Sequence, residues 1–384
     1  MDLSLGAAEA QFADEVREWL SANVETPPEF SDLAASIEWG RRWQAKLAEA
    51  GWVGIDWPAE YGGRGASPVD VAIFNSEYAR SRAPQLVNRV GINLAGPTLL
   101  AHGTPEQLAR WLPPITTAEE IWCQLFSEPG AGSDLSSLTT RAVRTGADGG
   151  GWLVSGQKVW TSYAQFAKFG ICLARTDPDT TGARGITLFA LEMTAPGVEI
   201  RPLVQMTGDA EFNEVFLDEV FVPDGQRIGA EHEGWAVAST TLAHERGTNF
   251  PFKEEVLHEG YLTSLFAEAA GRGTIQDRDV SDALVDAYVS LVVLRTHNWR
   301  TLSMLQKGGS PGPESSWVKL TWSNMTQHLS AAALNVLGPE APLFGQWQRQ
   351  WLWSKSASIA GGTSEVQRNV IGERILGLPR ERRP

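Results

Sequence analysis

A short stretch in the first half of the chain combines the residue types that hold a polar, planar ligand. It runs Phe126-Ser127-Glu128-Pro129-Gly130-Ala131-Gly132-Ser133-Asp134. Gly130 and Gly132 let backbone N–H groups approach a ligand closely, and Pro129 stiffens the loop. Ser127 and Ser133 each add a hydroxyl that both donates and accepts hydrogen bonds. The stretch predicts a site for a polar ring or a phosphate, with a plain surface turn as the alternative.

Two further stretches narrow this interpretation. Residues 158–162, Lys-Val-Trp-Thr-Ser, set a large aromatic side chain before two hydroxyls, and residues 361–368, Gly-Gly-Thr-Ser-Glu-Val-Gln-Arg, open a helix near the C-terminus. Distinctive stretches also lie at 57–63, Trp-Pro-Ala-Glu-Tyr-Gly-Gly, and at 372–379, Gly-Glu-Arg-Ile-Leu-Gly-Leu-Pro. Together with the loop, and in this order and spacing, they resemble the acyl-CoA dehydrogenase family of flavoenzymes. The resemblance covers nearly the whole chain.

Hydrophobic periodicity predicts that the first third of the chain, residues 1–119, is a helical domain. Apolar residues recur at helical spacing over residues 9–23 and again over 39–47. A further helix is expected from Pro68. The segment 104–107, Thr-Pro-Glu-Gln, has the pattern of a capping box with proline at the first helical position.

The middle third, residues 120–228, changes to the alternation typical of strands. The expected strands are residues 141–144, 152–154, 169–174, 185–192, 198–203 and 213–222. Their spacing favours a small antiparallel barrel or sandwich. Helical periodicity returns over residues 229–384, with long segments at 282–305 and 317–337 and a last helix near Thr363. The expected fold is therefore α+β, with a helical N-terminal domain, a middle β domain and a C-terminal four-helix bundle, as the resemblance also implies.

The composition of the chain excludes several classes of partner. A formal net charge of −14 over 384 residues argues against binding to nucleic acid or to an anionic membrane. No apolar run approaches the roughly 18 residues of a membrane span, and no secretory signal is visible at Met1. Cys123 and Cys172 lack metal-ligand spacing and are expected to be buried free thiols in a reducing cytoplasm.

The resemblance implies oxidation of an acyl-CoA thioester between its α and β carbons. In the family a carboxylate removes the α proton while the β hydrogen leaves as a hydride to flavin N5, and donors stabilise the thioester oxygen. Many members place the base directly before the Gly-Thr of the C-terminal motif, where this chain has Gly361. A second subset carries the base on the first long C-terminal helix, before an arginine, and the matching pair is Glu245-Arg246. Glu245 is thus the expected base, with a solvated helix carboxylate as the alternative.

Glycine at position 361 keeps its backbone N–H, which is the expected donor to the thioester oxygen. Because it also removes side-chain bulk, the sequence suggests room for a branched or polycyclic acyl group. The resemblance places the isoalloxazine ring of FAD against Gln124, Leu125, Phe126 and Ser127 and against Trp160, Thr161 and Ser162. Trp160 would pack on the ring, with core packing as the alternative. The other implied cofactor residues are Gly132, Ser133, Asn335, Gly338, Thr363 and Glu365, and the implied substrate residues are Ser133, Arg246 and Gly362.

One feature of the family is missing from the sequence. No Arg-x-x-Phe-Gly motif precedes the second long helix, and the corresponding segment, 271–278, offers only Arg272 and Arg278. A nucleophile-elbow pattern at 308–312 follows no strand and is not interpreted as a site. The histidines have no metal-ligand spacing, so no metal is predicted.

The function expected from the sequence is FAD-dependent dehydrogenation of an acyl-CoA to its 2-enoyl-CoA, with electron transfer flavoprotein as the implied electron acceptor. A homodimer or tetramer is expected, because FAD sites in the family lie between subunits. Two alternatives stay open. The chain could be a non-catalytic or half-site partner of a paralogue, which Gly361, Asn335 and the missing arginine motif favour. It could also be an oxidase that passes electrons to oxygen.

Overall fold

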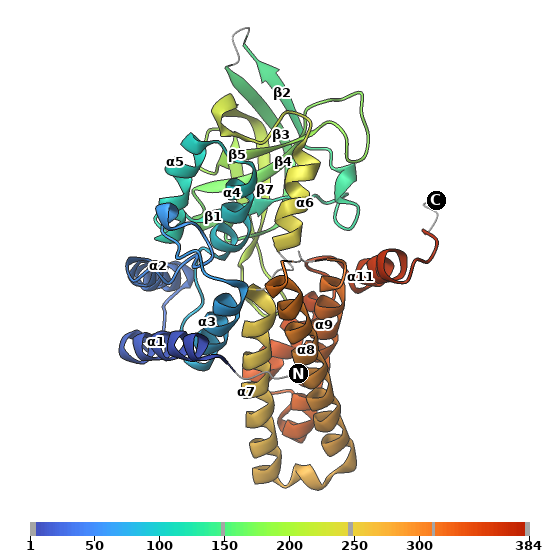
Figure 1. Ribbon diagram of the computed structural model, residues 1–384. Helices are drawn as coiled ribbons and strands as arrows, with labels where there is room; N and C mark the ends of the chain where they lie inside the picture. The colour runs from blue at the N-terminus through green and yellow to red at the C-terminus, as the bar shows by residue number, and fades with distance from the viewer. Residues whose placement is uncertain (1–4, 147–149, 245–248, 309–311, 381–384) are drawn as a thin grey trace. The chain divides into compact units, whose positions relative to one another are not determined.

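The structure is a computed structural model that describes residues 5–146, 150–244, 249–308 and 312–380 (Figure 1). The chain forms two compact units, each assembled from segments that are far apart in sequence. The sheet unit comprises residues 27–66 and 84–245, and the helical unit comprises residues 1–26, 67–83 and 246–384.

A mostly antiparallel sheet forms the centre of the sheet unit. Its strands are β1 (Trp122–Leu125), β2 (Arg141–Thr145), β3 (Gly151–Ser162), β4 (Phe169–Arg175), β5 (Ile186–Glu192), β6 (Val198–Leu203), β7 (Phe212–Pro223) and β8 (Arg227–Ile228). They are ordered β6-β7-β3-β2-β4-β5-β8, with β1 parallel to β4 at the side of this path. The only other parallel contact within the described sheet is one residue pair between β2 and β4.

Burial along the strands explains which of them the sequence pattern revealed. β4 and β5 are buried on both faces, so their residues form continuous apolar runs. β6 alternates between more exposed and less exposed positions, as a strand with one covered face should. β3 continues well beyond the expected residues 152–154. The sequence pattern missed its second half because that half contains Lys158, a charged residue that is nevertheless buried.

The sheet unit also contains helices. They are α2 (Leu33–Glu49), α4 (Gly96–His102), α5 (Pro105–Thr116) and α6 (Gly234–His244), with a π-helical turn at Gly91–Ala95 and 3₁₀ turns at Ala59–Tyr61, Leu135–Ser137, Ala164–Phe166 and Asp224–Gln226. Of these helices, α5 packs against β1 and β4, and α6 packs against β5. Trp111 of α5 packs edge-on against Trp122 and Phe169, with ring centroids 5.5 and 5.9 Å apart. The capping box is confirmed, because Thr104 N–H donates to Gln107 Oε1 at 3.0 Å and Gln107 N–H donates to Thr104 Oγ1 at 3.3 Å.

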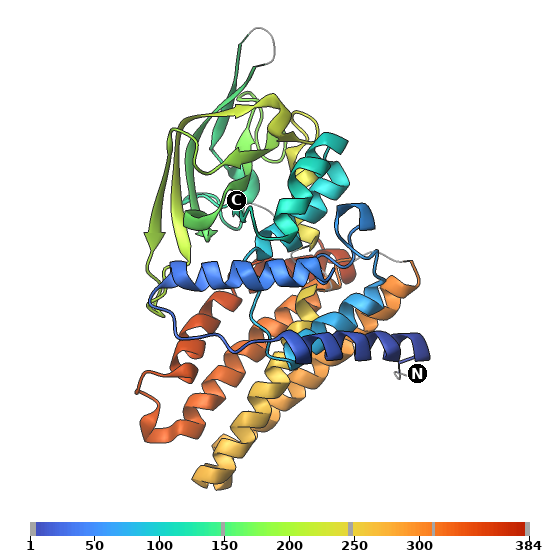
Figure 2. The ribbon, with the colours of Figure 1, turned by 90° about the vertical axis from the view of Figure 1, so that its left-hand side faces the viewer.

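Long helices make up the helical unit. They are α1 (Ala7–Asn23), α3 (Pro68–Arg80), α7 (Asn249–Arg272), α8 (Arg278–Gln306), α9 (Ser315–Leu337), α10 (Gln346–Ala357) and α11 (Ser364–Val370), with 3₁₀ turns at Thr274–Gln276 and Gly338–Glu340 and a π-helical turn at Ile371–Ile375. α7, α8, α9 and α10 form the expected four-helix bundle, and α7, α8 and α9 run side by side in both ribbon views (Figure 2). Leu265, Leu284, Leu291 and Leu329 belong to its core.

The N-terminal helices are divided between the two compact units. In the helical unit α1 packs against α3 and α3 packs against α7, whereas α2, α4 and α5 belong to the sheet unit. The domain boundaries expected from the sequence, after residues 119 and 228, stay a prediction. None of the described helices is both long and apolar enough to cross a membrane.

Candidate functional site

The loop that follows β1 is fixed to β3 through its backbone. Val159 N–H donates to the Ser127 carbonyl at 2.9 Å. Glu128 and Ala131 exchange two backbone hydrogen bonds of 3.1 Å each, which closes a tight turn. A Cβ atom at Gly130 or Gly132 would meet no atom within 4 Å. The loop therefore presents open backbone to the space above these glycines.

A buried ion pair lies directly behind this loop. Lys158 Nζ donates to Glu128 Oε1 at 2.9 Å and to the Phe126 carbonyl at 3.1 Å. The side chain of Lys158 is 0% exposed and that of Glu128 is 4% exposed. Glu128 also accepts hydrogen bonds from Thr139 N–H, Thr139 Oγ1 and Thr140 N–H at 2.7 to 2.9 Å. The pair thus connects the loop to β3 and to the start of β2.

The charge on Glu128 is strongly favoured in this environment. Burial alone raises the pKa of its carboxyl, but the Lys158 ammonium and the hydrogen bonds from Thr140, Lys158 and Thr139 outweigh burial and lower the pKa to about 2. Glu128 is therefore ionised throughout the physiological range of pH.

Trp160, in the second half of β3, is exposed at the surface of the protein. The register between β3 and β7 shifts between Lys158 and Thr161. At this bulge Trp160 has φ of 60°, a left-handed backbone that bulky side chains rarely adopt. The residue is 62% exposed, and its ring meets the edge of the Phe212 ring at a centroid distance of 6.2 Å. Core packing, the alternative interpretation of Trp160, is wrong.

The glycine loop and the end of β3 carry hydroxyl groups that are available to a ligand. The hydroxyls of Ser127 and Ser162 are partly exposed, and that of Ser133 is exposed; none of the three is engaged by another described residue. Leu125, Phe126 and Thr161 are buried, so they would meet a ligand only through their backbone.

Gln124 and Gly132 complete the group that the sequence analysis assigned to the ring. The Gln124 side chain is partly exposed and is not engaged by another described residue, while Gly132 is exposed. An exposed indole, open backbone and unengaged hydroxyls on neighbouring segments fit a flat, polar heterocycle.

The remaining expected residues lie at helix ends of the helical unit. Thr363 caps α11, because Val366 N–H donates to its Oγ1 at 3.2 Å, and Glu365 is exposed in the first turn of that helix. Asn335 is exposed in the last turn of α9, and Gly338 follows the helix with φ of 56°.

Gly361 and Gly362 form a turn before α11 that only glycine adopts readily. Their φ angles are 65° and 92°. The side chain of Gln367 fixes the turn, because its Nε2 donates to the Gly361 carbonyl at 3.0 Å and to the Gly362 carbonyl at 3.3 Å. The Gly361 N–H donates to no other described residue. This turn therefore offers a rigid backbone donor.

Two expected site residues, Glu245 and Arg246, lie outside the described residues. The arginines considered for the missing motif are in ion pairs. Arg272 pairs with Glu268 at 3.0 Å and with Glu340 at 2.9 Å. Arg278 pairs with Asp282 at 3.4 Å.

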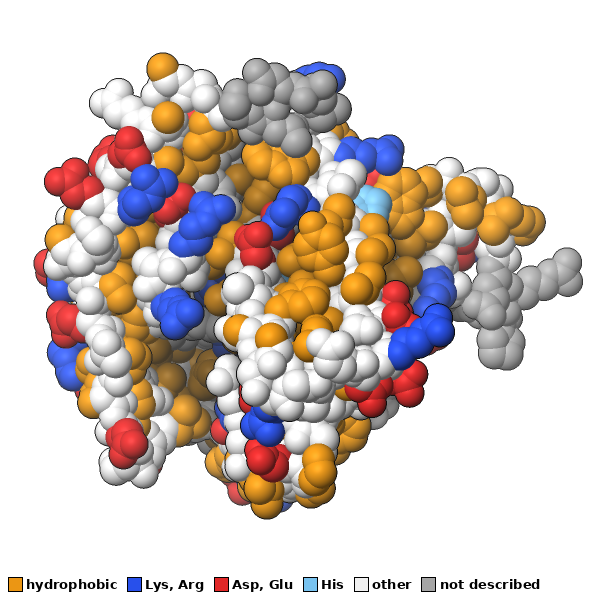
Figure 3. All heavy atoms as spheres, turned by 90° about the horizontal axis from the view of Figure 1, so that it is seen from below, with side chains coloured by type: hydrophobic (Ala, Val, Ile, Leu, Met, Phe, Trp, Pro, Cys, Tyr) orange, Lys and Arg blue, Asp and Glu red, His pale blue; other side chains and the backbone are white. Residues whose placement is uncertain are grey.

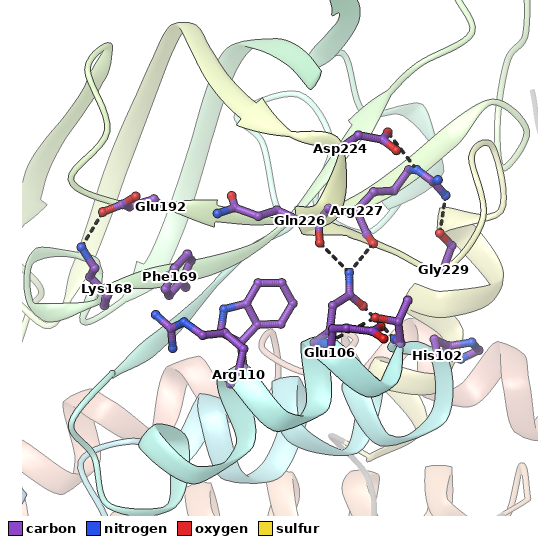
Figure 4. Close-up of a pocket in the computed structure, with 14 residues that line it drawn as sticks. His102, Glu106, Arg110, Lys168, Phe169, Glu192, Asp224, Gln226, Arg227 and Gly229 are labelled. Atoms are coloured by element: carbon purple, nitrogen blue, oxygen red, sulfur yellow. Dashed lines mark hydrogen bonds and ion pairs between the residues drawn. The ribbon is translucent and has the colours of Figure 1, made fainter. Parts of the chain in front are cut away.

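A separate groove of about 920 Å³ lies on the sheet unit (Figure 4). Its charged side chains pair with one another or with nearby groups: Lys168 bonds Glu192, and Arg227 lies 3.4 Å from Asp224. Gln107 Nε2 donates to the carbonyls of Gly225 and Arg227 at 2.9 and 2.8 Å across the groove. No residue of the expected site lines it, so the groove is distinct from the candidate site.

The sequence analysis missed the Glu128–Lys158 pair and the backbone strain at Trp160. An acid in the glycine loop and a lysine two residues before the tryptophan were the available signals, but neither shows that the two side chains meet. In the described part of the chain, no group of three or more His, Cys, Asp or Glu residues is placed to hold a metal ion.

Comparisons with known proteins identify the family of the chain. Family models for the N-terminal, middle and C-terminal domains of acyl-CoA dehydrogenases match residues 7–119, 123–220 and 232–376. Acyl-CoA dehydrogenase IpdE1 of Mycobacterium tuberculosis is 39% identical, over 97% of this chain and 98% of that protein.

Two solved structures share the fold over nearly the entire chain. The ChsE4–ChsE5 complex from Mycobacterium tuberculosis matches with a TM-score of 0.85 and 32% identity, over 99% of this chain and 100% of that one. The steroid acyl-CoA dehydrogenase Tcur3481–Tcur3483 matches with a TM-score of 0.83 and 27% identity, over 99% and 100%. The chain belongs to the acyl-CoA dehydrogenase family, whose members are FAD-dependent oxidoreductases.

Proposed function

We propose that the chain binds the isoalloxazine ring of FAD on the surface formed by Ser127, Trp160 and Ser162 and dehydrogenates an acyl-CoA there. The observation that carries the proposal is the pair of unengaged hydroxyls beside an exposed indole. Trp160 would cover part of the ring, while Ser127 and Ser162 would bond its polar edge. Bound FAD supplies the acceptor for the hydride that leaves the β carbon.

Glu245 is the proposed base. It would take the α proton as the thioester develops enolate charge. The proposal rests on family membership, since Gly361 stands at the alternative position of the base and Glu245-Arg246 matches the other one. The Gly361 N–H would donate to the thioester oxygen, and its lack of another described partner supports this role. Arg246, Gly362 and Ser133 are the proposed substrate contacts.

The proposed substrate is a branched or polycyclic acyl-CoA. Gly361 carries no side chain at the position where many members of the family carry a glutamate, and the acyl group would use this room. One matching solved structure is described as a steroid acyl-CoA dehydrogenase, which supports a polycyclic group. Turnover of short straight-chain thioesters alone would contradict this assignment.

A second candidate function is that of a partner subunit in a heteromeric enzyme. The structural relative ChsE4–ChsE5 is a complex of two differently named chains, and this chain lacks the Arg-x-x-Phe-Gly motif. In that case FAD would need residues of a paralogue. Electron transfer flavoprotein is the proposed electron acceptor, with oxygen as the acceptor if the chain is an oxidase. A cytoplasmic location remains a proposal.

Association with another subunit is supported by an apolar stripe on α8. Val285, Tyr288, Val289, Val292 and Val293 recur at helical spacing and are 38 to 53% exposed. Hydrophobic side chains also gather in several surface patches, separated by charged groups, on the face seen in Figure 3. We propose that the α8 stripe packs against another acyl-CoA dehydrogenase chain, a second copy or a paralogue.

An anaerobic visible spectrum of the purified chain, before and after addition of an acyl-CoA panel, tests the proposed function. A flavin band that bleaches with one thioester is the expected result. Glu245→Gln should retain the band and lose the bleaching. A protein that takes up no FAD alone but gains it with a co-expressed paralogue would instead favour the partner-subunit function. Persistent bleaching in Glu245→Gln would place the base elsewhere.

A further inference from the structure

The Glu128–Lys158 pair is positioned between the two segments that carry the proposed flavin contacts. Glu128 directly follows Ser127, and Lys158 precedes Trp160 by two residues. The Lys158 ammonium bonds both the Glu128 carboxylate and the Phe126 carbonyl, at 2.9 and 3.1 Å. A single buried cation therefore fixes the glycine loop relative to the end of β3.

Stability alone does not account for such a pair. Removing two charges from water costs several kcal/mol per ion, and well-packed apolar side chains of similar volume are often as stable. A buried pair is better explained when it fixes one arrangement of the chain. Here the arrangement includes the bulge at which Trp160 adopts φ of 60°. Lys158 is the last residue of β3 in register with β7 before that bulge, so its anchor determines where the strained segment begins.

We propose that Glu128 and Lys158 form a positioning pair, which holds the Ser127 loop and the Trp160 bulge in the geometry that receives the flavin and keeps the net charge behind it at zero. The inference rests on the proposed flavin site. Neither residue is a catalytic residue, because both side chains are buried behind the surface that would meet the ring.

Glu128 accepts more hydrogen bonds than Lys158 donates, so replacing Lys158 alone differs in effect from replacing both residues. Glu128 accepts three hydrogen bonds from Thr139 and Thr140 in addition to its bond from Lys158. Replacement of Lys158 removes the largest influence that lowers the pKa of Glu128, while the bonds from Thr139 and Thr140 remain, so the variants are compared at a pH high enough to ionise the carboxylate. Lys158→Met would leave a negative charge close to the flavin segments, where the local dielectric is low. Since reduction adds negative charge to a flavin, this variant should have a lower reduction potential.

The experiment compares Lys158→Met, Glu128→Gln/Lys158→Met and the wild-type enzyme. Three quantities are measured: the FAD dissociation constant by titration of the apoprotein, the reduction potential of the bound flavin against reference dyes, and the unfolding midpoint of the apoprotein. Lys158→Met should bind FAD at least about tenfold more weakly, because hydrogen bonds to a charged group are lost. The double variant should recover the reduction potential, because neutrality returns, while its FAD affinity stays low.

Lys168→Met is the matched control, because Lys168 pairs with Glu192 at a half-exposed position outside the proposed site. It should leave the FAD affinity and the reduction potential unchanged. If Lys158→Met does not fold, the neutral double variant still decides the question through its affinity. A double variant with wild-type affinity, or a folded Lys158→Met with wild-type affinity and potential, would overturn the inference alone. Wild-type protein that binds no FAD would overturn the proposed site as well.

Discussion

Replacement of Trp160 by glycine should separate the stability of the protein from its affinity for FAD. Glycine adopts the observed φ of 60° without the strain that a left-handed backbone imposes on tryptophan, about 1 to 2 kcal/mol. Two effects oppose this gain. The unfolded chain becomes more flexible, at a cost of about 0.5 to 1 kcal/mol. The edge contact with Phe212 is lost, worth about 0.5 to 1.5 kcal/mol. The change in the free energy of unfolding of the apoprotein should therefore lie between a gain of about 1 kcal/mol and a loss of about 1.5 kcal/mol.

The loss in FAD affinity follows from the exposed area of the indole. Trp160 is 62% exposed, so about 150 Å² of a side chain of about 250 Å² is available to a ligand. If a bound ring covers half of that area, the contact contributes about 2 kcal/mol. The dissociation constant of FAD should then rise about 30-fold.

The assay pairs denaturant unfolding of the apoprotein with FAD titration. Phe221→Ala is the control, because Phe221 is another exposed aromatic residue of the sheet unit, 49% exposed, outside the proposed site. It should not alter FAD binding. The reasoning is refuted if Trp160→Gly destabilises the apoprotein by several kcal/mol and binds FAD like the wild type. That result would mean that Trp160 serves folding and not the ligand.

Three further outcomes are expected. Folding lowers the pKa of Glu128 from 4.5 to about 2, so the free energy of unfolding should decrease by about 3 kcal/mol as the pH is lowered from 4.5 to about 2. Glu128→Gln should lack this decrease in acid denaturation curves. Gly361→Glu should not restore flavin bleaching to Glu245→Gln, because φ of 65° strains the new side chain; recovered bleaching would contradict the assigned turn. Val289→Asp on α8 should shift the protein to a smaller species in analytical ultracentrifugation, whereas Val143→Asp, at an equally exposed position of β2, should not.

The sequence predicted those helices and strands that are specified by residues close together in the chain. The helix that starts at Pro105 was identified by its capping box, and its side-chain bonds are present in the structure. β4 and β5 were expected within the strand-rich middle third, and the structure shows that both are buried on both faces. Cys123 and Cys172 are buried and free, as expected from their apolar surroundings.

Features that depend on residues far apart in the chain could not be predicted from the sequence. The second half of β3 contains Lys158, and only the carboxylate of Glu128, 30 residues away, explains how a lysine lies inside the sheet. The position of Trp160 illustrates the same limit. A tryptophan in a chain with 16 of them is usually a core residue, and only the register shift against β7 reveals that this one points outward.

The turn at Gly361 bears on where the catalytic base must come from. The φ of 65° at Gly361 disfavours any side chain, and Gln367 fixes the Gly361 carbonyl, so the turn can offer a ligand only a backbone group. The N–H that remains without a described partner is the kind of donor that an enolate oxygen needs. A donor for the oxygen does not remove the α proton, and that step requires a carboxylate from another segment. In the proposed function Glu245 would supply this carboxylate, because Glu245-Arg246 matches the other position at which the family carries its base. Under the proposed function, glycine at 361 and glutamate at 245 would therefore act together: Glu245 would take the α proton, and the turn would contribute only its backbone donor.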